Sequence, residues 1–310
     1  MSHTHENPVG LQEKYQRELL SAGLLIESSV PGVYGRSDVF EGVIQRFEAY
    51  LTRNSRHLQP EVIHFPPILS RDDYLKTSHI ETFPHLMGSL HGFLGNERTH
   101  MELLRKREHG ENWAADLEPI ELMMAPAACY PLYPTARDTT LPEKGRLIDL
   151  VGFVFRHEPS NDPARMQSFR QREFVQLGTP EQALNHRDDW IDKGIELYKG
   201  VGLDEVQRVI ANDPFFGRGG RAMVVSQIEQ AMKYELVFPI TSTEKPTAIA
   251  SSNYHMDHFS HSYNIKTTNG EFAHTACIGF GLERTALAMF KKFRFDVKAW
   301  PSSVKTALEL

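Results

Sequence analysis

Two short segments combine side chains that could bind a nucleotide: residues 155–158 (Phe-Arg-His-Glu) and residues 165–173 (Arg-Met-Gln-Ser-Phe-Arg-Gln-Arg-Glu). Alternate residues of a strand share a face, so each segment would direct every second side chain to the same side. Arg156 could neutralise a phosphate, Glu158 could accept a hydrogen bond from an exocyclic amine, and Phe169 could stack on a purine. The alternative is an ordinary hairpin whose charges pair on the surface.

A third segment, residues 277–286, carries Gly279 and Gly281 where a strand would pass into a helix. Glycine allows the backbone to approach a ligand closely, and Arg284 at the helix start could reach a phosphate or lie over a base. A tight turn followed by a solvated arginine is the alternative.

The chain has two cysteines, Cys129 and Cys277, which lie far apart in the sequence. They are either buried apolar thiols or metal ligands. A rival metal site is the stretch His255, Asp257, His258 and His261. On a strand His258 would oppose the other three, and no helical His-Glu-x-x-His spacing is present. The glycine-rich residues 217–221 lack the Lys-Ser/Thr ending of a phosphate-binding loop and are interpreted as a flexible loop.

A set of predicted helices and strands must position these groups. A helix starts at Ser37, with Asp38 and Glu41 resembling a capping box, and a strand over residues 61–69 is interrupted by Pro66 and Pro67. The remaining predicted elements are strands at 121–129, 147–156 and 167–177 with a loop at 157–166, helices at 180–199 and 204–211, a strand at 234–240, an extended polar segment at 248–265, and a strand-to-helix unit at 277–293. This order predicts an α/β (α+β) fold with a mostly antiparallel sheet flanked by helices.

The composition and charge disfavour some classes of function. The 310 residues are 40% hydrophobic, which is enough for a sizeable core, and a formal net charge of −6 disfavours a mainly nucleic-acid-binding role. No apolar run is long enough to cross a bilayer, and the N-terminus has no hydrophobic signal segment, so we expect a cytoplasmic protein without membrane contact. With no repeat or long linker, we expect a single domain over residues 1–310.

Together, these segments resemble the class II aminoacyl-tRNA synthetases. Residues 155–173 resemble motif 2, residues 277–286 resemble motif 3, and the helix at 38–51 with the strand after it resembles motif 1, the dimerisation element. Residues 248–265 are similar to the segment before motif 3 in seryl-tRNA synthetases. The resemblance implies a class II catalytic core with a helical insertion at about 180–211, and a homodimer formed through residues 37–70.

Two departures from seryl-tRNA synthetases favour a relative that does not use tRNA. No long helical hairpin for tRNA binding is predicted before Ser37, and the loop from Glu158 to Arg165 is shorter than its synthetase counterpart. Both features match the amino acid:carrier protein ligases. The resemblance therefore implies activation of a small amino acid, glycine or alanine, to an aminoacyl-adenylate, and its transfer to the phosphopantetheine thiol of a small acyl-carrier-type protein. A seryl-tRNA synthetase and a non-catalytic regulatory paralogue remain the alternatives.

The resemblance also assigns roles to residues of this chain. Arg156 and Arg284 are implied as catalytic and ATP-binding residues, and the other implied ATP-binding residues are Glu158, Arg165, Met166, Phe169 and Ser251. One zinc ion per subunit would be held by Cys129, Glu173 and Cys277, with Glu173 and Cys277 beside the substrate amino acid. Three protein ligands leave a fourth tetrahedral position for the substrate amine.

Magnesium would enter with ATP. A metal-binding glutamate of the synthetase segment corresponds to Ala248 here, so Ser251 and either Glu235 or Glu244 would help to hold the ion. The helices at 180–211 allow two interpretations. Their apolar residues (Trp190, Ile191, Ile195 and Tyr198) cover the core, or the helices form a carrier-protein dock beside the site with cations at Arg187, Lys193, Lys199 and Arg208.

Overall fold

A seven-stranded sheet forms the centre of the computed structural model, which describes residues 8–217 and 220–310. Its strands are β3 (Glu61–His64), β7 (Arg146–Phe155), β8 (Ser168–Gly178), β9 (Gln207–Ile210), β10 (Lys233–Phe238), β11 (Thr247–Met256) and β12 (His274–Gly281). Their spatial order is β3-β7-β8-β12-β11-β10-β9, in which β3 and β7 are parallel and each of the other pairs is antiparallel. The predicted fold class is therefore confirmed.

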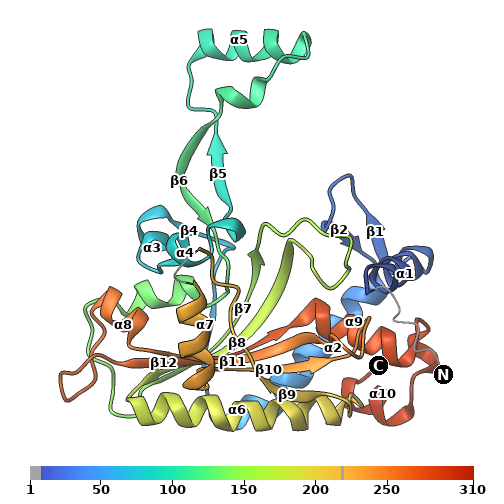
Figure 1. The fold of residues 1–310 in the computed structure, drawn as a ribbon, viewed down its shortest axis with the longest axis vertical. Helices are drawn as coiled ribbons and strands as arrows, with labels where there is room; N and C mark the ends of the chain where they lie inside the picture. The colour runs from blue at the N-terminus through green and yellow to red at the C-terminus, as the bar shows by residue number, and fades with distance from the viewer. Residues whose placement is uncertain (1–7, 218–219) are drawn as a thin grey trace.

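Helices pack on both faces of this sheet (Figure 1). One face carries Phe174 and Phe280, and it is covered by α2 (Asp38–Ser55), α6 (Pro180–Gly200) and α9 (Leu282–Phe293). The other face is covered in part by the 3-10 helix η4 (Tyr130–Ala136) and by α8 (His258–Tyr263), where Tyr133 and Phe259 stack with ring centroids 3.9 Å apart. The candidate site lies on this second face.

The helix α2 shows how the sequence determines which side of a helix packs against the sheet. Its apolar residues recur on one side and are buried, namely Phe40, Val43, Ile44, Phe47 and Leu51. The helix N-cap is Ser37, whose side chain accepts a hydrogen bond from the Phe40 N–H, so the predicted capping role of Asp38 is wrong by one residue. The predicted helix at 180–199 is confirmed with its Thr179–Gln182 capping box.

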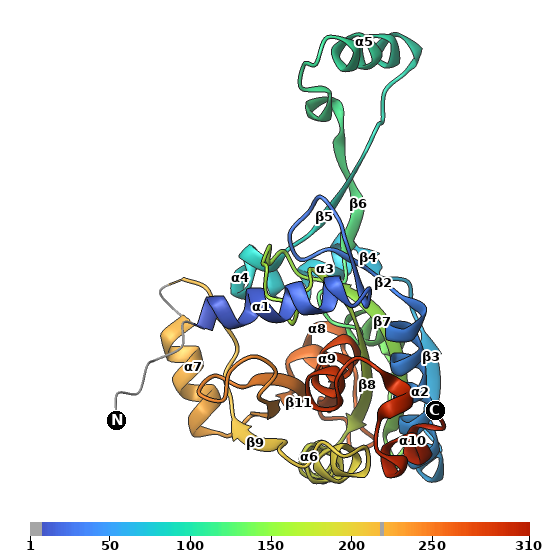
Figure 2. The ribbon, with the colours of Figure 1, turned by 90° about the vertical axis from the view of Figure 1, so that its right-hand side faces the viewer.

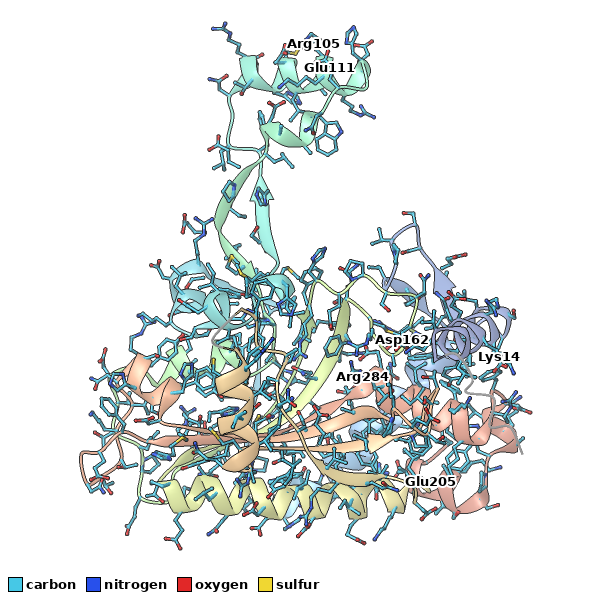
Figure 3. The ribbon with its side chains drawn as sticks, viewed as in Figure 1. Lys14, Arg105, Glu111, Asp162, Glu205 and Arg284 are labelled. Atoms are coloured by element: carbon cyan, nitrogen blue, oxygen red, sulfur yellow. The ribbon has the colours of Figure 1, made fainter. Side chains whose placement is uncertain are left out.

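A slender arm rises from the main body (Figures 1 and 2). A three-stranded sheet of β4 (Ile68–Ser70), β6 (Glu118–Met124) and β5 (Ser89–Gly92) forms its base, and α5 (Glu97–Glu108) and η3 (Trp113–Asp116) form its tip. Figure 3 places Arg105 and Glu111 at this tip, where they form an ion pair with an N–O distance of 2.7 Å. Sequence analysis did not predict the arm, whose helix α5 is mostly polar and has no buried residues.

The N-terminal elements pack against the main core. They are α1 (Pro8–Ser21) and the hairpin of β1 (Leu25–Glu27) and β2 (Tyr34–Arg36). The buried Tyr15 hydroxyl donates to the carbonyl oxygen of Leu287 on α9 at 2.7 Å, which ties the first helix to an element 272 residues away. The remaining described helices are η1 (Arg56–Leu58), α3 (Arg71–Leu75), α4 (His79–Thr82), η2 (Pro84–Leu86), α7 (Gly220–Glu229), η5 (Val297–Ala299) and α10 (Ser302–Leu308). None of the helices in the described ranges has the length and apolar character needed to span a membrane.

Three predicted elements differ from the structure. Residues 204–211 are not a helix: β9 pairs with β10 there, because β-branched residues such as Val209 and Ile210 suit an edge strand. The strand predicted at 121–129 ends at Met124, before Pro126, so that Cys129 lies next to η4. The extended segment predicted at 248–265 ends at Met256 and α8 follows it.

The strands predicted at 61–69, 147–156, 167–177 and 234–240 are found close to their expected bounds, as is the unit at 277–293. The strand at 61–69 is interrupted as expected, since β3 ends at His64 and β4 begins after the two prolines. In the predicted glycine loop, residues 218 and 219 lie outside the described residues, while Gly220 and Arg221 begin α7.

Candidate active site

A pocket of about 240 Å³ opens on the sheet face opposite to α6. Strand alternation explains its lining, because residues that are register partners on neighbouring strands lie on the same face. Glu173 on β8 is opposite Gly279 on β12, and Asn253 on β11 is opposite Cys277. The pocket therefore contains the alternate residues of four adjacent strands, from β8 to β10.

The structure brings most of the predicted site residues into this one pocket. Seven of them line it, namely Cys129, Arg156, Phe169, Glu173, Ser251, Cys277 and Arg284. The remaining three, Glu158, Arg165 and Met166, do not line the pocket but lie in the loop that joins β7 to β8. Segments that are more than a hundred residues apart in the sequence thus meet at one site.

Two arginines supply positive charge to the pocket. The Arg156 side chain donates to the Pro126 carbonyl at 3.1 Å and its guanidinium lies 5.5 Å from the centre of the Phe169 ring. Arg284 donates to the carbonyl oxygens of Ala164 and Ala248 at 2.7 and 3.0 Å. Burial, followed by the nearby charge of Arg156, lowers the pKa of Arg284 to about 10. A phosphate anion would relieve this repulsion between the two guanidinium groups.

The loop between β7 and β8 is held in place by the N-terminal hairpin. Gln167 donates its backbone N–H to the Gly32 carbonyl and its side-chain N–H to the Pro31 carbonyl, both at 2.8 Å. Gly32 has φ +76°, and a Cβ there would lie 3.2 Å from the Arg165 carbonyl oxygen, so glycine suits this turn. Within the loop Arg165 and Glu158 form an ion pair at 3.1 Å. In Figure 3, Asp162 of this loop lies near Arg284.

The two cysteines and Glu173 form a buried cluster at one end of the pocket. Each side chain is at most 4% exposed, and the neighbouring Cys277, together with burial and the charge of Glu173, raises the pKa of the Cys129 thiol. The Ala128 N–H donates to Glu173 Oε1 at 3.0 Å. Burial, together with the charge of Cys277, raises the pKa of Glu173 to about 8. The predicted trio therefore lies together although Cys129 comes from a different layer of the fold.

This donor set fits a zinc ion in its chemistry. No three or more His, Cys, Asp or Glu side chains within residues 8–217 and 220–310 already stand in a metal-binding arrangement. The two thiols and the carboxyl are held together away from water, and this burial, with the charge of Cys277, disfavours ionisation of Glu173 by raising its pKa. Two thiolates and one carboxylate would be zinc ligands of the usual types.

The rival histidine site is not supported. Asp257 and His261 are not part of a strand, because Asp257 is the residue before α8 and His261 lies within that helix. His255 lines the pocket, whereas His258 bonds the Thr77 carbonyl at 3.2 Å. The three residues that were expected to share a strand face are therefore not on one strand.

Glu235 is better placed than Glu244 to approach a bound nucleotide. It lines the pocket and is the register partner of Ser251, while Glu244 is not among the lining residues. Lys233 lies beside it and binds both Glu235 and Asp213, with Nζ–O distances of 3.0 and 2.6 Å.

Sequence analysis missed several residues of the pocket, among them Asp213, Lys233 and His79. His79 is buried, and its Nδ1 lies 2.6 Å from the hydroxyl of Tyr74. Burial, together with Arg156, lowers the pKa of His79 to about 4. No local motif marks these residues, since each reaches the pocket only through the tertiary fold.

Of the two interpretations of residues 180–211, the structure supports for α6 the one in which its apolar residues cover the core, and not a position beside the pocket. Trp190 stacks on Phe174, on the opposite face of the sheet, with ring centroids 4.1 Å apart. Trp190, Ile191 and Tyr198 are buried, so the apolar residues of α6 cover the core. Arg187 is buried as well and donates to the Ala231 carbonyl.

Comparison with known proteins places this site in a family. Residues 113–293 match the tRNA synthetase class II core domain (G, H, P, S and T). Amino acid–acyl-carrier-protein ligase 1 of Bradyrhizobium diazoefficiens is 40% identical over 90% of this chain and 85% of its own length. Ligase 2 of the same organism is 40% identical over 94% of this chain and 87% of its own. The chain belongs to the amino acid–acyl-carrier-protein ligase family of class II synthetase cores.

More distant relatives of the family are serine–tRNA ligases. The type-2 serine–tRNA ligase of Methanococcus aeolicus is 31% identical over 59% of this chain and 36% of its own length. Among solved structures, the seryl-tRNA synthetase of M. kandleri in complex with A. aeolicus tRNASec aligns with a TM-score of 0.79 at 20% identity, over 96% of this chain and 60% of that one. This likeness shows that the two proteins share a fold.

Proposed function

We propose that this enzyme activates a small amino acid with ATP and transfers it to the phosphopantetheine thiol of a carrier protein. The observation that carries the proposal is the meeting of Arg156, Arg284 and the Cys129–Glu173–Cys277 cluster in one pocket of a chain 40% identical to two amino acid–acyl-carrier-protein ligases. Glycine or alanine is the proposed substrate.

The first step needs charge neutralisation rather than a protein nucleophile. The amino acid carboxylate attacks the α-phosphorus of ATP, a P–O bond breaks, and pyrophosphate leaves with magnesium. Arg156 would bind the α-phosphate, while Arg165 and Arg284 would meet the distal phosphates. Phe169 would stack on adenine, and Glu158 with the backbone of Met166 would bind the adenine edge. Ser251 and Glu235 would support the magnesium ion.

The second step is an acyl transfer. The carrier thiol attacks the carbonyl carbon of the adenylate, the C–O bond to the phosphate breaks, AMP leaves, and the thiol proton is released. The pocket contributes by holding both partners in position.

In this proposal Cys129, Glu173 and Cys277 hold one zinc ion per subunit, which would supply a Lewis-acid site for the substrate amine. Glu173 and Cys277 would then lie beside the amino acid. The proposed unit is a single domain that acts as a cytoplasmic homodimer through residues 37–70, without tRNA as a partner. Exposed apolar residues in that region, Leu58 and Val62, support the dimer.

ATP–pyrophosphate exchange measured with each of the twenty amino acids tests the first step. Exchange with glycine or alanine is expected, and exchange with none of the twenty would contradict the proposal. Transfer of the labelled amino acid to a phosphopantetheinylated carrier protein, compared with the same carrier lacking the arm, tests the second step. Acceptance by total tRNA instead would favour the synthetase alternative.

A further inference from the structure

His255 is a pocket residue to which the proposed function gives no role. It lies at an irregularity of β11, where the pairing with β12 passes from Tyr254–Ala276 to Met256–Thr275 and leaves His255 without a partner in the ladder. The next residue, Met256, has φ +53°, a left-handed backbone conformation that is unfavourable for residues other than glycine. Bulges of this kind re-aim a side chain and are frequent beside active sites.

The bulge directs the imidazole to Cys277. Nε2 of His255 lies 3.7 Å from the Cys277 sulfur, and Nδ1 lies 3.0 Å from the hydroxyl oxygen of Thr275. Thr275 is fully buried and precedes Cys277 by two residues on β12, so both face the same side. A second group from β11, the side-chain amide of Asn253, lies 3.6 Å from the same sulfur.

These contacts determine which ring nitrogen carries hydrogen. A thiolate sulfur that binds a metal ion can only accept hydrogen bonds, so Nε2 must be the donor to Cys277. Nδ1 of the neutral ring then accepts a hydrogen bond from the Thr275 hydroxyl. Thr275 therefore holds the ring in the tautomer and orientation that serve the sulfur.

We propose that His255 is a positioning residue that donates a hydrogen bond to the Cys277 thiolate and so strengthens zinc binding, with Thr275 fixing its tautomer. The inference rests on the proposed zinc site and extends it to residues outside the ligand set. Partners of metal ligands orient those ligands and contribute to metal affinity, and their removal typically weakens binding by about 10–100-fold.

The test measures the zinc dissociation constant of metal-free protein by competition with a chromogenic chelator. His255→Leu keeps an apolar group of moderate size but removes the donor, and it should weaken zinc binding by about 10–100-fold. His255→Gln keeps an N–H donor and should restore most of the affinity. Thr275→Val should cause an intermediate loss. The matched control is His258→Gln, three residues along the chain, where no change is expected.

Cobalt substitution separates a hydrogen-bond donor from a fourth ligand. If His255 acts as proposed, the visible bands of the cobalt-loaded His255→Leu protein keep the intensity of a four-coordinate ion. A change in coordination number, or zinc binding by His255→Leu as tight as in the wild type, would overturn the inference. If the wild-type protein itself binds no zinc, the proposed zinc site fails and the inference with it. Circular dichroism shows whether His255→Leu folds. If it does not, the zinc affinities of His255→Gln and Thr275→Val are compared in its place. A zinc affinity of Thr275→Val equal to that of the wild type would then overturn the role of Thr275.

Discussion

Arg170 on β8 binds Glu283, the residue before Arg284, through two separate groups. Its backbone N–H lies 2.7 Å from Glu283 Oε2, and its side-chain Nε lies 2.9 Å from Oε1. The same guanidinium also binds both carboxylate oxygens of Glu41 on α2, each at 2.8 Å. One buried carboxylate thus joins the strand that carries Glu173 to the helix start that carries Arg284.

Glu283→Gln should lower both stability and ATP affinity. The substitution removes one of the two carboxylates that Arg170 binds, while Glu41 remains, at a cost of about 1–3 kcal/mol in the free energy of unfolding. Since Arg284 follows directly in the chain, the KM for ATP should rise more than kcat falls. Urea unfolding and exchange kinetics measure the two effects, and an unchanged KM for ATP would show that the ion pair does not position Arg284.

Cys277→Ser should remove zinc and abolish adenylate formation while the fold remains intact. A hydroxyl replaces the thiolate with little change in volume, but it is a poor zinc ligand at neutral pH. Metal content and ATP–pyrophosphate exchange are the measurements, with circular dichroism as the control for folding. A variant that lacks zinc and yet activates its amino acid at the wild-type rate would exclude the metal from substrate binding.

The protein should sediment as a two-fold dimer at micromolar concentration. Val62 on the edge strand β3 is 65% exposed, and a lysine there should shift the equilibrium to monomers by placing a charge in the interface. Val209 on β9, at the other edge of the sheet, offers a matched control, since Val209→Lys should leave the dimer intact. A wild-type monomer would contradict the prediction outright.

Acid should destabilise the protein below about pH 6.5 through its buried histidines. Burial, opposed by a hydrogen bond to the Phe174 carbonyl, lowers the pKa of His186 to about 4. The unfolded chain, with a histidine pKa near its ordinary value, then binds more protons than the folded one as pH falls from 6.5 to 4. The loss for His186 is about 2 kcal/mol at pH 5. Unfolding free energies at pH 7 and pH 5 should differ less in His186→Gln than in the wild type, and an equal difference would exclude His186 as a source.

Removal of the tip of the arm should leave adenylate formation unchanged. Gly92 and Glu118 are register partners at the end of β5 and β6 next to the tip, so an Asn-Gly turn can replace residues 93–117 and close the hairpin. No residue of that segment lines the pocket. The shortened protein also loses exposed apolar side chains, among them Leu94, Met101 and Trp113, and should be at least as soluble. A strong fall in pyrophosphate exchange would show that the arm supports the site.

Sequence reasoning succeeded where a local pattern and the tertiary environment agree. The stripe from Phe40 to Leu51 predicts a buried helix face, and alternation predicts that Phe169 and Glu173 reach one pocket. It failed at residues 204–211. The spacing of Val206, Val209 and Ile210 also fits a helix, and only the pairing with β10 makes this segment a strand. The contact of His255 with Cys277 could not be predicted from the sequence. The direction of the His255 side chain depends on a bulge that forms only when β11 pairs with β12.

The hydrogen bond between Tyr15 and Leu287 has a consequence for folding during synthesis. The helix α1 gains this partner only after Leu287 has left the ribosome, and β8 likewise pairs with β12 only after residue 281 has been made. Contacts between such distant segments slow folding, since a long loop must close before they form. Apolar surface of the nascent chain therefore stays exposed until β12 and α9 have been made. Chaperones that bind such surface should raise the yield of active enzyme.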